Sequence, residues 1–400
     1  IGTGMTNSLN NQPNPVDVVS VIYDLESMTI TWEEYVPNLS RINQMKQNTR
    51  STVTNDFVSY ELLQSDSEDG TYTSVVVITD QSITSHSITE YDPTQENWFK
   101  VKVTDFWGLY STGSRMTNEL DSPPTQIDIT SVTYDLSDMV ITWVQSSDND
   151  FVSYELLQSN YQYGIYSSVV VITDQSKTSH SITEYDPLQE NWFKVKVTDY
   201  WGLNSTGNGM TNDIDSPPTQ IDVSSVTYDL TEMVITWGES SDNDFGSYEL
   251  LQSDTEDGNY TFVTVINDQS TTSHSITEYD PTQENWFKVK VTDYWGLNST
   301  GDGMTNSLDN VPNPVNVTSV TYDLTEMVVT WGQSSDNDFV SYELLQSDSE
   351  DGTYTSVIVI TEQSTTSHSI TDYNPTQENW FKVKVTDYWN LTSTGDGMTN

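Results

Sequence analysis

Cysteine is missing from this chain of 400 residues. Its absence excludes a disulfide framework and any metal site built on thiolates. The chain also lacks a run of about 18 apolar residues, so no segment is predicted to span a membrane. It begins at Ile1 without a methionine or a secretory leader, and we therefore expect a processed chain or a window of a longer array.

Positive charge is scarce, since 13 Lys and Arg stand against 60 Asp and Glu and give a net charge of −47. A surface this acidic argues against nucleic acid as a partner, because binding to phosphates needs basic patches. The hydrophobic content of 34 % combined with this charge is typical of disordered chains. The 12 tryptophans, however, recur in strand-like settings and predict packed cores instead.

An internal period of 94 residues organises the sequence and fits whole domains in tandem rather than solenoid repeats. Residues 1–12 match the end of a repeat, and we interpret them as the trailing G strand of a preceding one. Four full repeats are predicted at 13–121, 122–215, 216–309 and 310–400. Prolines at every joint favour an elongated rod over flexibly linked beads.

Within each repeat, alternating apolar and polar residues predict short strands. In repeat 3 the strands are predicted at 221–228, 233–237, 247–253, 260–266, 273–277, 286–292 and 301–306. Strand B is expected to bury one tryptophan per repeat, namely Trp32, Trp143, Trp237 and Trp331. Seven strands with turn signals between them and no convincing helix predict an all-β chain of four tandem seven-stranded β-sandwiches.

Two stretches of repeat 3 resemble fibronectin type III modules of prokaryotic extracellular and surface proteins. TSHSITEYDPTQENWFKVKVTDYWGLNS is similar to the E-to-G half of such a module, and SSDNDFGSYELLQSDTEDGNY to its B–C loop, C strand and next hairpin. The resemblance covers all four repeats and implies a scaffold, without a particular function. Asparagine replaces the family's tyrosine at the E–F corner, so another hydrogen bond, such as one from the asparagine amide, is expected to close it. The four asparagines are Asn97, Asn191, Asn285 and Asn379.

Repeat 1 alone carries an insertion, which adds 17 residues to the B–C loop between Trp32 and Phe57. Its basic residues, predicted to form an interface, are Arg41, Lys46 and Arg50. Its apolar residues, predicted to lie on one face of a short helix, are Leu39, Ile42 and Met45. Because the insertion is basic and the ends of the modules are acidic, we expect it to connect chains end to end. The trailing G strand at 1–12 either belongs to a preceding module of a longer array or pairs with a sandwich of a neighbouring chain, as in strand donation.

No pattern in the sequence points to catalysis, and we predict a non-enzymatic protein. Each repeat has one histidine, with no second histidine or cysteine at ligand spacing, which favours packing at the core edge. These histidines are His86, His180, His274 and His368. Paired carboxylates occur throughout, but near-identical copies of one site in four repeats would be unusual for an enzyme.

Clusters of aspartate are candidates for calcium, which prefers oxygen ligands; the alternative is that they are solvated turn residues. The candidates in the B–C loops are Asp148, Asp150, Asp242, Asp244, Asp336 and Asp338, and those in the hairpin after strand C are Asp254 and Asp257. Successive modules are expected to bring Asp254, Asp257 and Asp280 towards Asp336 and Asp338. A divalent ion would offset the repulsion between them.

The outward face of the F strand presents a Trp-Lys-x-Lys stripe, with the tryptophans Trp98, Trp192, Trp286 and Trp380. It is either a cation–π ladder within the chain or a lateral interface between chains. A second set, Trp107, Trp201, Trp295 and Trp389, is predicted to cover the joints between repeats. Sequons for N-glycosylation occur at Asn38, Asn204, Asn259, Asn298, Asn316 and Asn390.

Together these features predict a structural repeat protein outside the cell, in a filament or a cell-surface stalk. Its expected partner is a second copy of itself in a head-to-tail polymer, with lateral contacts as an additional possibility. The alternative is a binding module, either a calcium-dependent adhesin or an accessory carbohydrate-binding region of a larger secreted protein. An exposed aromatic platform confined to one repeat would favour the binding module.

Overall fold

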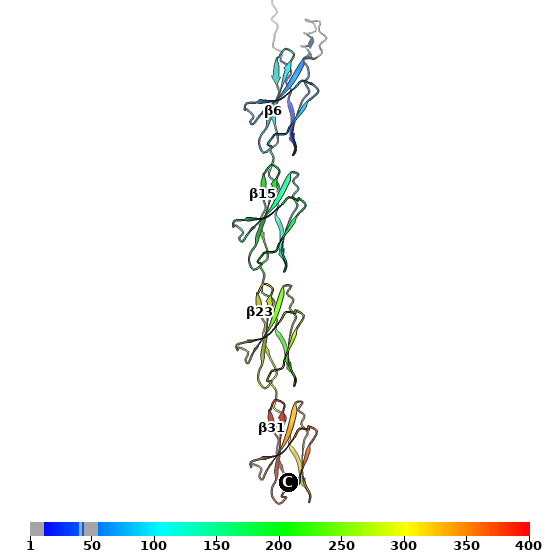
Figure 1. The fold of residues 1–400 in the computed structure, drawn as a ribbon, viewed down its shortest axis with the longest axis vertical. Helices are drawn as coiled ribbons and strands as arrows, with labels where there is room; N and C mark the ends of the chain where they lie inside the picture. The colour runs from blue at the N-terminus through cyan, green and yellow to red at the C-terminus, as the bar shows by residue number, and fades with distance from the viewer. Residues whose placement is uncertain (1–11, 40–41, 44–54) are drawn as a thin grey trace, which may run out of the picture. The chain divides into compact units, whose positions relative to one another are not determined.

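The computed structural model describes residues 12–39, 42–43 and 55–400. These residues form eight β-sheets, paired as four repeated β-sandwiches (Figure 1). By contacts the chain divides into two units, one up to residue 214 and one from 215 to 400, and each holds two sandwiches. In the described part, no helix is long and apolar enough to cross a membrane.

Every repeat contains the same succession of strands. Repeat 1 has β1 Val18–Tyr23, β2 Met28–Trp32, β3 Phe57–Ser65, β4 Thr73–Ile78, β5 Ser85–Ile88, β6 Trp98–Asp105, β7 Tyr110–Thr112 and β8 Met116–Thr117. Repeat 2 has β9 Ile129–Tyr134, β10 Met139–Trp143, β11 Phe151–Ser159, β12 Ser167–Ile172, β13 Ser179–Ile182, β14 Trp192–Asp199, β15 Asn204–Thr206 and β16 Met210–Thr211.

The second unit repeats this order. Repeat 3 has β17 Val223–Tyr228, β18 Met233–Trp237, β19 Phe245–Ser253, β20 Thr261–Ile266, β21 Ser273–Ile276, β22 Trp286–Asp293, β23 Asn298–Thr300 and β24 Met304–Thr305. Repeat 4 has β25 Val317–Tyr322, β26 Met327–Trp331, β27 Phe339–Ser347, β28 Thr355–Ile360, β29 Ser367–Ile370, β30 Trp380–Asp387, β31 Thr392–Thr394 and β32 Met398–Thr399.

The two sheets of a repeat follow a fixed strand order. In repeat 3 one sheet runs β17-β18-β21, and the other runs β20-β19-β22-β23, with β24 also paired to β22. All of these pairs are antiparallel. This arrangement, A-B-E against C′-C-F-G, makes each repeat a fibronectin type III-like module, as the sequence predicted.

The last strand differs from the prediction of a single strand at 301–306, because it is split into β23 and β24. The interruption falls at Gly301, where a Cβ atom would lie 1.8 Å from the carbonyl oxygen of Ile221. The chain entering the repeat passes so close there that only glycine fits, and the ladder breaks at that point.

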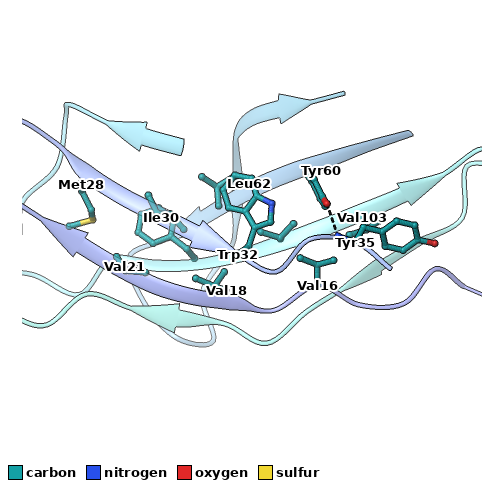
Figure 2. Packing of buried hydrophobic residues seen from close by; sticks show 12 residues of the cluster. Val16, Val18, Val21, Met28, Ile30, Trp32, Tyr35, Tyr60, Leu62 and Val103 are labelled. Carbon is teal, nitrogen blue, oxygen red and sulfur yellow. Dashed lines mark hydrogen bonds between the residues drawn. The ribbon is translucent and has the colours of Figure 1, made fainter. Parts of the chain in front are cut away.

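Alternation along the F strand builds the core. In β22 every second residue is buried, and Phe287, Val289 and Val291 are fully inaccessible. The predicted tryptophan of strand B is buried in every repeat, with 3–4 % of its surface exposed. In repeat 1 the Trp32 ring packs edge-on against Tyr60, 5.8 Å between centroids (Figure 2).

The E–F corner closes through asparagine, which confirms the prediction that the asparagine amide supplies the hydrogen bond there. In repeat 3 the Asn285 amide donates hydrogen bonds to the carbonyl oxygens of Asp280 and Gln283, at 2.9 and 3.0 Å. The backbone N–H of Asn285 in turn donates to the side-chain oxygen of Asn306, at 2.8 Å. The side chains of two asparagines, Asn285 and Asn306, therefore hold this corner together.

The insertion of repeat 1 is described only in part. Ile42 is buried, with 2 % of its surface exposed, and its N–H donates to the carbonyl oxygen of Asn38. Residues 39, 42 and 43 are helical, as the spacing predicted, but Leu39 is 73 % exposed and therefore does not share a buried face with Ile42. Arg41, Met45, Lys46 and Arg50 lie outside the described residues, as does the segment 1–11.

Candidate metal centres

Three groups of aspartates recur with the period of the repeats, and we call them the acidic triads. Within each triad, one carboxylate oxygen per residue lies within 4.8 Å of the other two, so the group could hold a metal ion. The triads are Asp121–Asp150–Asp199, Asp215–Asp244–Asp293 and Asp309–Asp338–Asp387. Each combines an aspartate from the segment entering a repeat with one from its B–C loop and one from the end of its F strand.

The aspartate at the end of the F strand is the buried member of each triad. Asp199 closes β14, and its Oδ1 accepts the backbone N–H groups of Trp201 and Leu203 at 3.0 and 2.8 Å. This tight turn includes Gly202, whose φ of 87° favours glycine. Asp199 is only 2 % exposed, and its Oδ2 has no hydrogen-bond partner in the described structure.

The aspartate from the entering segment is fixed by the preceding repeat. Asp121 donates its backbone N–H to the carbonyl oxygen of Pro93 at 2.9 Å, and its Oδ1 accepts the hydroxyl of Tyr23 at 3.1 Å. The ring of Trp201 then contacts Tyr23 and Tyr91, with centroids 6.4 and 5.3 Å apart. Repeat 1 thus supplies one aspartate of the triad and an aromatic contact to the end of repeat 2.

The triad between repeats 3 and 4 is built in the same way. Asp309 donates its N–H to the carbonyl oxygen of Pro281 at 2.8 Å, and Asp309 accepts the Tyr228 hydroxyl at 3.2 Å. Trp389 contacts the ring of Tyr279 at 5.3 Å. The prediction that the tryptophans of the F–G turn cover joints is therefore confirmed for Trp201 and Trp389.

Electrostatics at the triads disfavours three negative charges without a counter-ion. At an effective dielectric constant of about 20, two unit charges about 4.8 Å apart repel by roughly 3 kcal/mol. Burial, and then the charges of Asp150 and Asp121, raise the pKa of Asp199. Burial and the charge of Asp338 likewise raise the pKa of Asp309. The remaining raised pKa values, each with burial as the first cause, are those of Asp150, Asp244, Asp293 and Asp387.

The pKa values of the tyrosines that donate to the aspartates of the entering segments are raised as well. Burial, followed by the hydrogen bond and charge of Asp121, raises the pKa of Tyr23 to about 12. Burial and the charge of Asp309 raise the pKa of Tyr228 to about 12. Both hydroxyls therefore stay protonated at neutral pH and remain donors to the triads.

Repeat 1 is built differently at the corresponding position. The residue equivalent to Ser146, whose N–H donates to the hydroxyl of the C-strand tyrosine, is Tyr35 in repeat 1. Figure 2 shows this hydrogen bond between Tyr35 and Tyr60, 2.7 Å long. The buried Tyr35 hydroxyl donates to Asp56 at 2.9 Å, where Asp56 is the counterpart of Asp150. The counterpart of Asp121 is Asn10, outside the described residues.

Of the aspartates predicted as calcium ligands, three belong to triads: Asp150, Asp244 and Asp338. Asp148 and Asp242 instead accept the hydroxyls of Ser146 and Ser240, both at 2.8 Å. Burial raises the pKa of Asp336, which neighbours a triad without belonging to it. The hairpin residues Asp254 and Asp257 are exposed, and the acidic partners found with Asp338 are not those predicted.

Sequence reasoning missed the entering and F-strand aspartates. The sequence analysis assigns no site to Asp293, and it places Asp309 only at the end of repeat 3. Their signal was the same period of 94 that relates the tryptophans, since both recur at that spacing. The missed members are Asp121, Asp215, Asp309, Asp199, Asp293 and Asp387.

The lysines of the Trp-Lys-x-Lys stripe interact with residues of the same repeat. Lys288 lies over the ring of Tyr260, 4.6 Å from its centroid, rather than over a tryptophan. Lys290 pairs with Glu249 at 2.5 Å, and the Trp286 indole N–H donates to Glu284 at 2.9 Å. A cation–π contact therefore exists but involves the hairpin tyrosine. A lateral interface at Trp98, Trp192, Trp286 and Trp380 stays a prediction.

The predicted histidine and glycosylation positions are exposed or half-buried. The histidines are half-buried on the E strands, as His274 is opposite Ile235. Five sequon asparagines are exposed: Asn204, Asn259, Asn298, Asn316 and Asn390. Asn38 is half-buried. Glycosylation of any of them stays a prediction.

Comparison with known proteins gave no matching family model and no matching curated protein. Similar solved structures include the FN1–FN3 domains of chicken CNTN1, at 16 % identity over 70 % of this chain and 97 % of that one, with a TM-score of 0.24. A tetra-tandem repeat in the extending region of a large adhesion protein is similar at 13 % identity over 96 % of this chain and 98 % of that one, with a TM-score of 0.34.

Proposed function

We propose that this chain is a structural, non-enzymatic repeat protein of an extracellular filament or cell-surface stalk, with calcium at the ends of its modules. The observation that carries the proposal is the recurring joint. One repeat contributes a tyrosine-held aspartate and an aromatic ring to the next repeat, as in the contacts of Asp121 and Trp201. A joint of this kind fixes neighbouring modules to each other, which a load-bearing spacer requires. The surface charge of −47 keeps such a chain soluble in salty, cation-rich surroundings.

End-to-end polymerisation through the insertion of repeat 1 is part of this proposal. Deleting residues 38–51 would test it, but the deletion also removes the buried Ile42. The sharper variant is Arg41→Gln with Arg50→Gln, which leaves Ile42 in place. Its matched control is Arg115→Gln with Lys177→Gln, which changes the net charge by the same amount elsewhere. Electron microscopy should show filaments for wild type and control and only short particles for the insertion variant. Filaments of normal length from that variant would remove the insertion from the polymer contact.

A second candidate function, adhesion through an accessory binding surface, is favoured by the hairpin of repeat 2. Tyr161, Tyr163 and Ile165 are 73, 93 and 96 % exposed there. The equivalent residues of repeat 3 are the polar Thr255, Asp257 and Asn259. Exposed aromatic rings in one repeat are a platform on which a sugar ring can stack.

Binding of the full chain to a glycan array tests this second candidate. The double substitution Tyr161→Thr with Tyr163→Asp introduces the residues found in repeat 3. It should abolish any binding seen with wild type. Equal binding by both chains, or no glycan bound by wild type, would leave only the structural role.

A further inference from the structure

We propose that each of the three acidic triads binds one divalent cation, calcium being the ion that fits best, and that the equivalent position of repeat 1 binds none. The proposal deepens the cation part of the proposed function but does not depend on polymerisation. It starts from the buried carboxylates Asp199, Asp293 and Asp387, which are 2, 4 and 1 % exposed. In each, one oxygen accepts backbone N–H groups, and Oδ2 has no hydrogen-bond partner among the described residues.

A buried acceptor without a donor is costly, and an acidic neighbour cannot satisfy it. The residues grouped around Asp199 are two more acceptors, Asp121 and Asp150. The Oδ2 atoms of Asp121 and Asp338 are also buried without a hydrogen-bond partner. A group that satisfies several carboxylate oxygens at once, without supplying a proton to each, is a metal cation.

The spacing of the triads suits a single ion. Oxygens that bind calcium lie about 2.4 Å from it, so two ligands of one ion are at most about 4.8 Å apart. The oxygens of each triad meet this limit, since all lie within 4.8 Å of one another. Each triad offers one such oxygen per residue, so water would fill the rest of the six to eight positions that calcium takes.

The chemistry of the ligands selects the class of ion. All three are carboxylates, with no histidine in the group and no cysteine in the chain, which favours a hard cation over zinc or copper. Magnesium requires a smaller octahedral shell and usually keeps several waters. Ligands from separate segments of the chain, as Asp309, Asp338 and Asp387 are, adapt more readily to calcium.

Repeat 1 serves as the internal comparison. Its Asp56 already receives a hydrogen bond from the Tyr35 hydroxyl, and its entering segment has Asn10 instead of an aspartate. The Tyr35 hydroxyl supplies a donor to Asp56, and the sequence has one carboxylate fewer among the counterparts of a triad, so less negative charge calls for a cation than in the other repeats. The binding stoichiometry of the full chain is therefore expected to be three.

Isothermal titration calorimetry of the full chain with CaCl2, after removal of bound ions with EDTA, tests the proposal. Wild type should bind three ions, and Asp121→Asn with Asp150→Asn should bind two. Asparagine keeps an acceptor for the Tyr23 hydroxyl, so the aromatic contacts with Trp201 should persist, and circular dichroism checks the fold. MgCl2 should compete only weakly.

Two controls make the count specific. Asp254→Asn with Asp257→Asn changes the charge equally on an exposed hairpin and should leave three ions bound. Asp56→Asn alters the equivalent position of repeat 1 and should also leave three. Absence of saturable binding in wild type, or equal losses in the triad and hairpin variants, would overturn the proposal, whereas the filament assay would be unaffected. If the double variant fails to fold, Asp121→Asn alone gives the same test, and three ions bound to a folded Asp121→Asn would also overturn it.

Discussion

Replacing Asp309 with asparagine should change the stability of repeat 4 in opposite directions with and without calcium. Without calcium, Asp309 faces Asp338 and Asp387, with oxygens within 4.8 Å. Two members of the triad are partly exposed, and solvent screens their charges. The repulsion of roughly 3 kcal/mol per pair is therefore reduced to about 1 kcal/mol. Removing two such pairs should stabilise the repeat by about 1–2 kcal/mol at low salt.

With calcium the same substitution removes a ligand. A bound ion stabilises the folded state by about 2.7 kcal/mol at one hundred times its Kd, and the variant should lose most of this. For a domain of this size, 1 kcal/mol shifts Tm by about 4–8 °C. Differential scanning calorimetry should therefore show the Asp309→Asn transition above that of wild type in EDTA and below it in calcium.

The matched control for this experiment is Asp254→Asn, an exposed aspartate of the hairpin in repeat 3. It removes the same charge and should shift Tm by little in either condition. A shift of Asp309→Asn in the same direction in EDTA and in calcium would refute the reasoning, because the two contributions have opposite signs.

Three further predictions concern the core, the corner and pH. Trp237→Ala should cost roughly 3–5 kcal/mol in urea unfolding, because Trp237 is 4 % exposed and packs on Tyr248; an unchanged midpoint would contradict its role. Asn285→Ala removes the amide hydrogen bonds to Asp280 and Gln283 at the E–F corner and should cost about 1–3 kcal/mol, whereas Asn259→Ala on the exposed hairpin should cost almost nothing. The pKa of Asp293 in the folded chain is raised above the ordinary 3.8, so the folded state holds a proton that the unfolded chain releases. Without calcium, the free energy of unfolding should therefore fall as pH rises from 3.8 through the raised value. The Tm difference between wild type and Asp293→Asn should widen over that interval in EDTA, and a constant difference would argue against the coupling.

Most of the fold could be predicted from local sequence patterns. Alternation placed Phe287 and Val289 in the core, and the phase of strand B placed Trp237 there, because a strand has a fixed period of two. The asparagine corner could also be predicted, since an amide has the donors that the missing tyrosine would have supplied. The splitting of the last strand could not, because it depends on the close approach of Ile221 to Gly301.

The triads were only partly predictable for a related reason. Asp244 lies within an acidic loop, whereas Asp215 and Asp293 come from two other segments that are far apart in the sequence. Their proximity is produced by the packing of the entering segment against the B–C loop and the F strand. An exposed hairpin such as Asp254–Asp257 has a denser cluster of charge but remains solvated, so local density of acidic residues was a poor guide.

Small-angle X-ray scattering of the full chain in EDTA and in calcium tests most directly whether cations at the triads fix the modules to each other. In a companion chain, Asp121, Asp215 and Asp309 are changed to asparagine. This variant lacks one carboxylate in each triad and is otherwise identical to wild type. We expect calcium to change the pair-distance distribution of wild type to one with sharper inter-module peaks, and the companion chain to respond very little. An equal response of both chains, or none in wild type, would contradict it.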